Sequence, residues 1–149
     1  MNVEISKVGI EYKPELHNLI AEFYGISLKD PIAKKLNSCL NEVLINPKYG
    51  SVFIIKSSVQ IIGYIILTFG YSLEYGGRDA YIDEFYIKEG FRNKGIGSKA
   101  LEYVVKYART TGIKALHLEI KNKHKDAARL YERNGFSKRK SKFMTLRLE

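Results

Sequence analysis

A short segment that combines glycines with basic side chains could bind an anionic ligand. It lies between a predicted strand and a predicted amphipathic helix. Glycine lets the backbone approach a ligand closely, and the N–H groups and dipole at a helix start favour negative charge. We therefore predict a phosphate-binding turn. Its residues are Arg92, Asn93, Lys94, Gly95, Ile96, Gly97 and Ser98.

Two other phosphate motifs fit this turn less well. A P-loop needs lysine and then serine or threonine directly after its second glycine, whereas Gly95 is followed by Ile96 and Gly97. The segment Gly95–Ala100 matches the dinucleotide fingerprint G-x-G-x-x-A, but that fingerprint follows its strand through a very short turn. Several residues separate Ile87 from Gly95, and too little chain follows for a six-stranded dinucleotide fold.

Two adjacent carboxylates interrupt the apolar strand that precedes the turn. Asp83 and Glu84 lie within the predicted strand 80–88. Ionisable groups in an apolar strand are costly without a use, so either one could act as a general base. Adjacent strand residues point to opposite faces, so we expect only one to face a given site. We favour Glu84 and leave Asp83 open; the alternative is that both are solvated or paired with basic residues.

Composition narrows the class of protein. The chain has 149 residues, of which 45% are hydrophobic, and its formal net charge is +9. These values exclude disordered and collagen-like proteins, and the length suits one domain over residues 1–149. The single cysteine, Cys39, excludes an internal disulfide framework and a cysteine-rich zinc site. Since His17, His117 and His124 lack ligand spacing, we expect no metal.

No segment of the sequence predicts membrane insertion or export. The longest apolar run, residues 61–69, contains Gly63, Tyr64 and Thr68 and is much shorter than the roughly 20 residues that span a bilayer. The first residues lack a long apolar stretch and a small-residue cleavage site. We expect a cytoplasmic protein without membrane association.

The basic residues concentrate near the C-terminus. Residues 121–149 carry ten Lys or Arg and three acidic residues. Such a segment could bind nucleic acid or a phosphate-rich small ligand, or could form a solvated basic surface. The sequence has no RNP-like aromatic pair and no helix-turn-helix signature, so we expect no specific nucleic-acid partner.

Hydrophobic periodicity predicts the elements that position these residues. We expect strands at 3–10, 51–56, 59–71, 80–88 and 113–120, and short terminal strands at 136–139 and 143–148. We expect one helix from Pro14, one after Asp30-Pro31 with Cys39 on its apolar face, and helices at 96–111 and 125–134. The order β-α-α-β-β-β-α-β-α-β-β implies an α/β fold with helices on both faces of a mixed sheet.

Three segments in order resemble motifs of the GNAT superfamily of N-acetyltransferases. Residues 92–97 resemble its coenzyme A motif, Q/R-x-x-G-x-G/A. Residues 81–87 are similar to the family's strand along the pantetheine arm, and residues 127–136 are similar to its A-x-x-L-Y-E-x-x-G-F segment. Residues 71–84 resemble, more weakly, the diamine and thialysine acetyltransferase branch. The motifs cover the C-terminal half, and the element order of the N-terminal half agrees.

The resemblance implies a single GNAT-like domain with a mostly antiparallel sheet and transfer of acetyl from acetyl-CoA to a primary amine in a ternary complex. Tyr131 would protonate the departing thiolate, and a backbone N–H near Tyr86 would polarise the acetyl oxygen. The family often has asparagine seven residues before the tyrosine; here His124 stands there and Asn122 precedes it, so either could contact the pantetheine. The implied acetyl-CoA contacts are Phe85, Tyr86, Ile87, residues 92–98, Tyr131 and Asn122 or His124.

The acceptor is left open by the sequence. The family's acceptor site is built by the two early helices and the loops around residues 73–78 and 137–142, where we read no motif. The partner is thus a small-molecule amine or a protein amine, and the family often forms homodimers. Two alternative functions remain: a basic nucleic-acid-binding domain, and a catalytically silent acyl-CoA-binding protein.

Overall fold

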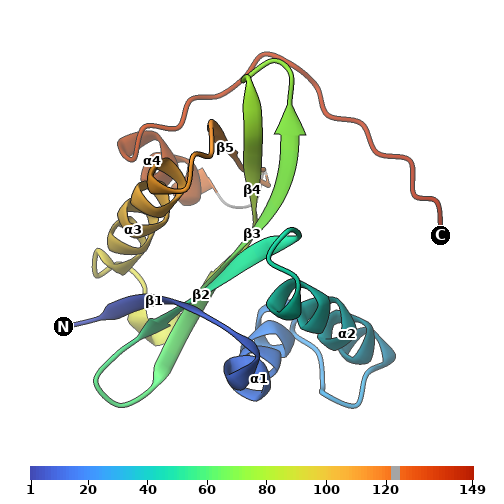
Figure 1. Ribbon diagram of the computed structural model, residues 1–149. Helices are drawn as coiled ribbons and strands as arrows, with labels where there is room; N and C mark the ends of the chain where they lie inside the picture. Colours follow the sequence, from blue (N-terminus) through green and yellow to red (C-terminus); the bar gives the residue numbers. More distant parts are fainter. Residues whose placement is uncertain (122–124) are drawn as a thin grey trace. The chain divides into compact units, whose positions relative to one another are not determined.

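Five strands form one sheet, in the order β1-β2-β3-β4-β5, in the computed structural model (Figure 1). Strands β1 to β4 are antiparallel neighbours, and β5 runs parallel to β4. The structure describes residues 1–121 and 125–149. Its elements are β1 (Glu4–Val8), η1 (Ile10–Tyr12), α1 (Lys13–Tyr24), α2 (Pro31–Ile45), β2 (Gly50–Lys56), β3 (Ile61–Ser72), β4 (Gly77–Ile87), η2 (Glu89–Phe91), α3 (Ile96–Thr110), β5 (Ala115–His117) and α4 (Lys125–Arg133). The mixed, mostly antiparallel sheet with helices confirms the predicted α/β fold class.

The described chain forms two compact units, Met1–Glu119 and Ile120–Glu149. Of the described elements, the first unit holds the sheet and helices α1 to α3, and the second holds α4.

The helices begin and end at the residues that their sequence favours. Asp30 caps α2, since its carboxylate accepts the N–H of Ile32 (2.9 Å) and Pro31 follows as the first helical residue. Helix α1 ends at Gly25, whose φ of 66° is left-handed. Among the described residues, no helix is long and apolar enough to span a membrane.

Helices cover both faces of the sheet in the first unit (Figure 1). On one face, Val52 and Ile54 of β2 belong to the same buried cluster as Leu16 of α1 and Leu40 of α2. On the other, the Phe53 ring contacts the rings of two α3 tyrosines edge to face, at 4.9 and 6.0 Å between centroids. Strand β2 is therefore apolar at successive positions because both of its faces are buried.

The two predicted terminal strands, 136–139 and 143–148, are wrong. The structure describes this whole segment and assigns no strand to it. The apolar side chains of residues 143–148 are exposed: Phe143 by 76%, Met144 by 91%, Leu146 by 82% and Leu148 by 91%. A strand becomes stable by pairing its backbone and burying one face. Residues 136–149 form no strand, and residues 143–148 bury no apolar face, so alternation alone was a misleading pattern.

Strand β5 is shorter than predicted, and Cys39 is exposed rather than buried. Strand β5 covers only Ala115–His117, because it pairs with β4 at Asp79–Tyr81 and not beyond. Cys39 lies on α2 one residue before the buried Leu40, outside the buried face of the helix.

Candidate active site

A β-bulge interrupts β4 at the two carboxylates. Glu84 pairs with Ile66 of β3, and Ile82 pairs with Leu67, so Asp83 is the extra residue without a partner. A bulge adds one residue to one strand, bends it and increases its twist. The bulge could not be predicted from the sequence, because both carboxylates fit a regular strand equally well.

The bulge changes the face of the sheet to which the following β4 side chains point. Ala80 packs in a cluster with Ala108 of α3, whereas Tyr86 packs in the cluster formed by α1 and α2. Residues separated by an even number share a face in a regular strand, so the extra residue at Asp83 accounts for the change. It places Glu84 and Tyr86 on the α1 side.

The Glu84 carboxylate accepts one hydrogen bond on each oxygen. The hydroxyl of Tyr64, from β3, donates to Oε1 at 2.7 Å, and the hydroxyl of Tyr24, the last residue of α1, donates to Oε2 at 2.5 Å. Tyr64 is fully buried, so a core side chain fixes one oxygen of the carboxylate. Among the described residues, no Lys, Arg or His side chain forms an ion pair with this carboxylate.

Burial dominates the acidity of both carboxyls. It raises the pKa of Glu84, the two tyrosine hydroxyls lower it, the charge of Asp83 raises it, and the net shift is upward. Burial also raises the pKa of Asp83. The negative charge of Asp83 helps to raise the pKa of the Glu84 carboxyl and that of the Tyr24 phenol. The expectation that the two carboxylates face opposite sides assumed a regular strand, which the bulge removes.

One edge of β4 is open beyond the bulge. Lys88 donates its N–H to the carbonyl of Ile62 in β3 (2.8 Å). N–H direction alternates along an antiparallel strand, so the N–H groups of Ile87 and Phe85 point away from β3. Pairing with β5 ends at Tyr81, and no other described strand covers this edge. Backbone donors of the predicted pantetheine strand are thus available to a ligand.

A glycine in β3 lets the two strands approach closely here. A Cβ on Gly63 would lie 2.3 Å from the carbonyl oxygen of Tyr86 and 3.2 Å from Cα of Ile87. Neither backbone atom can move without disturbing β4, so any larger residue would displace the strand that carries Glu84.

The predicted phosphate-binding turn forms directly before α3. Asn93 and Gly95 both adopt left-handed backbone, with φ of 60° and 77°. No side chain caps α3 at Gly95. The side chains of Arg92 and Lys94 are exposed, and Arg92 Nε donates to the carbonyl of Ile87 (2.7 Å). Exposed cations beside an uncapped helix start fit a phosphate ligand.

The residues of this turn differ in how much of each could contact a ligand. The Ile96 side chain is 4% exposed and belongs to the core, so only its backbone could reach a ligand. Gly97 and Ser98 are half-buried in the first turn of α3. Phe85 and Ile87 are also half-buried.

The end of α1 makes a second bridge to β4. The Tyr86 hydroxyl donates to Oε1 of Glu22 at 2.8 Å, and Lys88 Nζ lies 4.0 Å from the other oxygen. The Arg92 guanidinium lies 5.5 Å from the centroid of the Tyr86 ring. The site is therefore bordered by α1 on one side and by the turn before α3 on the other.

The second unit contains Tyr131 on α4. Its ring meets Phe136 edge to face at 5.8 Å, and burial raises the pKa of its phenol. Asn134 Nδ2 donates to the carbonyl of Leu130 (2.7 Å), and Gly135 ends the helix with φ of 94°. The other predicted contacts of this region, Asn122 and His124, lie outside the described residues.

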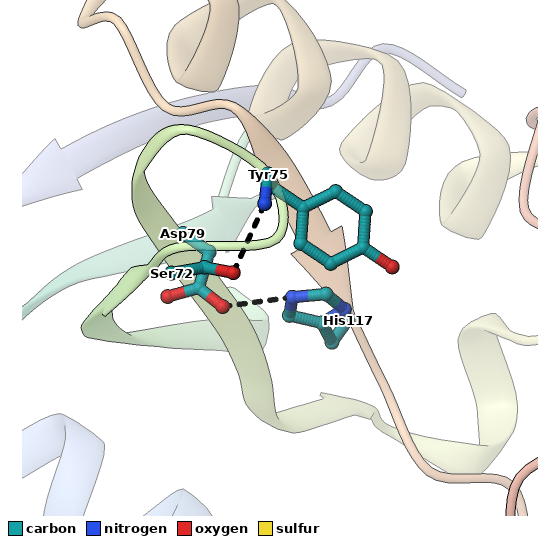
Figure 2. Close-up of polar contacts among 4 residues, drawn as sticks. All are labelled: Ser72, Tyr75, Asp79 and His117. Atoms are coloured by element: carbon teal, nitrogen blue, oxygen red, sulfur yellow. Dashed lines mark hydrogen bonds and ion pairs between the residues drawn. The ribbon is translucent and has the colours of Figure 1, made fainter.

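A second polar cluster lies where β4 pairs with β5 (Figure 2). His117 Nε2 is 2.9 Å from Oδ2 of Asp79, and Asp79 is 8% exposed. The imidazole lies beside the rings of Tyr75 and Tyr81, at 5.2 and 4.8 Å between centroids. In the same figure, the backbone N–H of Tyr75 donates to Ser72 Oγ (3.2 Å). Among the described residues, no three His, Cys, Asp or Glu side chains gather to hold a metal.

Sequence reasoning missed Glu22, Tyr24 and Tyr64. Tyr64 carried a usable signal, because a buried tyrosine in an apolar strand needs a partner for its hydroxyl. Glu22 and Tyr24 carried none, since their role depends on how the end of α1 packs across β4.

An open β4 edge, a phosphate-type turn before a helix and a half-buried carboxylate occur together in the first unit, and this arrangement fits a phosphate-containing coenzyme. The sequence model of the acetyltransferase (GNAT) family matches residues 13–136. The chain belongs to this family.

Members of this family named thialysine N-epsilon-acetyltransferase are similar to half of this chain. The chain is 35% identical over 75 residues to thialysine N-epsilon-acetyltransferase of Bos taurus and 33% identical over 75 residues to that of Sus scrofa. Each match covers 50% of this chain and 44% of the relative, so the chain spans less than half of their length.

Solved structures share the fold over nearly the whole chain. An integron cassette protein from the mobile metagenome of Cole Harbour Salt Marsh matches with a TM-score of 0.85 and 28% identity, covering 97% of this chain and 90% of that one. A predicted acetyltransferase of Clostridium acetobutylicum, solved with acetyl-CoA, matches with a TM-score of 0.79 and 21% identity, covering 99% and 97%. The second likeness concerns the fold alone.

Proposed function

We propose that this chain transfers the acetyl group of acetyl-CoA to a primary amine by direct attack in a ternary complex. The amine nitrogen bonds to the acetyl carbon, the carbon–sulfur bond breaks, and the CoA thiolate leaves. The observation that carries the proposal is the position of the Glu84 carboxylate. Two tyrosine hydroxyls hold it, and it lies on β4, the strand whose neighbouring N–H groups face an open edge.

Glu84 is the proposed general base, acting directly or through water. An alkylamine with a pKa of about 10.4 is neutral in roughly one molecule in 2,500 at pH 7, which adds about 4.6 kcal/mol to the barrier. A carboxyl with a raised pKa accepts the amine's proton more readily than an ordinary one. Asp83 is the second candidate, since its charge reaches Glu84.

The acetyl donor is proposed to bind along β4 and the turn before α3. The N–H of Phe85 or Ile87 would hydrogen-bond the acetyl oxygen, on which negative charge develops. Residues 92–98 would hold the pyrophosphate through backbone N–H groups and the charges of Arg92 and Lys94. Asn122 or His124 would contact the pantetheine.

Tyr131 is the proposed donor to the departing thiolate. Burial raises the pKa of its phenol, so the hydroxyl keeps its proton at neutral pH and can donate it. Its helix carries the family-like A-x-x-L-Y-E-x-x-G-F segment.

The proposed acceptor is a small primary amine of the thialysine or diamine class. The support is the similarity over half the chain to thialysine N-epsilon-acetyltransferases. The acidic side chains Asp83 and Glu84 lie beside Tyr24 at the end of α1 in an otherwise basic protein, which favours a cationic acceptor.

Two experiments test the function. Acetyl-CoA should raise the melting temperature of the wild type, because a ligand that binds only the folded state stabilises it. Gly97→Asp should abolish that shift by placing bulk and negative charge at the helix start. A screen of thialysine, lysine, diamines and peptide amines, monitoring release of the CoA thiol, then identifies the acceptor. No shift with acetyl-CoA and a shift with NAD would refute the donor.

A further inference from the structure

Two hydroxyl–carboxylate bonds bridge the end of α1 to β4. In one, Tyr24 of the helix donates to Glu84 of the strand at 2.5 Å. In the other, Tyr86 of the strand donates to Glu22 of the helix at 2.8 Å. Both bridges hold the same helical turn to the same strand, but only the first reaches the proposed base.

The two tyrosines on Glu84 are held in different ways. Tyr64 is fully buried in the core between α1, α2 and the sheet. Tyr24 is 44% exposed, and its ring packs edge to face on Phe23 at 5.2 Å. Tyr24 is also the last residue of α1, directly before the left-handed Gly25. One oxygen of Glu84 is therefore fixed by the core, and the other by a partly exposed helix end.

We propose that Tyr24 is a positioning residue for Glu84, whose Oε2 it holds through its hydroxyl while Tyr64 holds Oε1. A carboxylate offers about four acceptor positions, and the two tyrosines occupy two of them. The others stay available for the proton of an amine or of a bridging water. The inference rests on the proposed function of Glu84.

Tyr24 also keeps Glu84 ionised. Burial raises the pKa of the carboxyl, and the Tyr24 hydroxyl, which bonds to the charged form, opposes that rise. Without this hydroxyl, a larger fraction of Glu84 would be protonated at neutral pH and unable to accept a proton.

The kinetic test is the Tyr24→Phe variant, which keeps the ring and removes the hydroxyl. We expect the acid limb of the kcat/KM profile to move up by about 0.5 to 1 pH unit, so kcat/KM below the limb falls about 3- to 10-fold and recovers at high pH. The KM for acetyl-CoA should not change.

Glu22→Ala is the matched control. It breaks the bridge to Tyr86 at the same helical turn and leaves both hydrogen bonds of Glu84 in place. If Tyr24 acts only by fastening α1 to the sheet, Glu22→Ala will shift the profile in the same way, and the proposal is overturned. Tyr71→Phe, on an exposed strand end, controls for loss of a hydroxyl elsewhere.

A titration of the free protein separates this inference from the proposed function. Carbon NMR follows the Glu84 carboxyl, which Glu84→Gln assigns, in the wild type and in Tyr24→Phe. A higher midpoint in Tyr24→Phe supports the positioning role, and an unchanged midpoint overturns it. Full activity of Glu84→Gln would instead refute Glu84 as the base, whatever the titration shows.

Discussion

Two carboxylates of β4, the buried Asp79 and the half-buried Glu84, lie on either side of the bulge and have different hydrogen-bond partners. Asp79 meets an imidazole, with 2.9 Å between its Oδ2 and Nε2 of His117 (Figure 2). Among the described residues, the Glu84 carboxylate is hydrogen-bonded only by the hydroxyls of Tyr24 and Tyr64. Asp79 and His117 lie where β4 pairs with β5, whereas Glu84 lies beside the open edge of β4.

The difference indicates which carboxylate can do chemistry. A carboxylate that shares its charge with a cationic or hydrogen-bonded imidazole is committed to that partner. Glu84 is half-buried with neutral hydrogen-bond donors, so its carboxyl keeps a raised pKa and can take up a proton. We therefore assign Asp79 a structural role and propose the reaction at Glu84.

Glu84→Gln should give the largest effect. The amide cannot accept the amine's proton, so kcat should fall by about 10²- to 10⁴-fold, the range for loss of a general base. Steady-state kinetics and the acetyl-CoA-induced melting shift, measured on the same variant, check this. The shift should persist, because Glu84 is not a proposed contact of the donor. Loss of both would point to misfolding instead.

Tyr131→Phe sharpens the comparison with a group that donates rather than accepts a proton. The ring remains, so packing on Phe136 should be nearly intact. We expect kcat to fall by about 10- to 10³-fold with little change in acetyl-CoA affinity, because the hydroxyl matters mainly in the transition state. Wild-type turnover in this variant would remove Tyr131 from the mechanism.

Asp79→Ala should separate stability from chemistry. It leaves the His117 imidazole without its partner and should lower the free energy of unfolding by about 1–3 kcal/mol. At a temperature where the variant is fully folded, kcat should change by less than about 3-fold. Chemical denaturation and steady-state kinetics measure the two. A loss of kcat comparable to that of Glu84→Gln would contradict the division between the two carboxylates.

Asp83→Asn should give the smallest effect and decides between the adjacent acids. The charge of Asp83 raises the pKa of Glu84, so its removal lowers that pKa. The acid limb of kcat/KM should therefore move to lower pH by a fraction of a unit, with kcat at pH 8 nearly unchanged. A pH profile of the variant measures both. A 10²-fold loss of kcat would instead identify Asp83 as the base.

Local patterns predicted the elements, and the details of the site depended on packing. The turn at residues 92–98 and the helix start at Asp30 follow from residue types, so they could be predicted from the sequence. The bulge at Asp83 did not follow, because one extra residue changes pairing without changing composition. The terminal strands were predicted wrongly for the opposite reason. Residues 143–148 have the apolar pattern of a strand, but their apolar side chains are exposed.

The hydrogen bonds on Glu84 show the same limit. Tyr24 is 60 positions from Glu84 in the chain, and Tyr64 is 20 positions from it. No local pattern encodes such contacts. The carboxylate itself was identifiable as an ionisable group in an apolar strand, whereas its partners depend on the packing of α1.

The most direct test of the proposed acetyl transfer is to measure both of its products, the acetylated amine and the CoA thiol. Wild-type protein is incubated with acetyl-CoA and the best amine of the screen, and mass spectrometry of the amine is compared with the amount of CoA thiol released. We expect one acetylated amine for each CoA released, with both products lost in Glu84→Gln and both kept in Asp79→Ala. Release of CoA without an acetylated amine, or binding of acetyl-CoA without release under any amine, would contradict it.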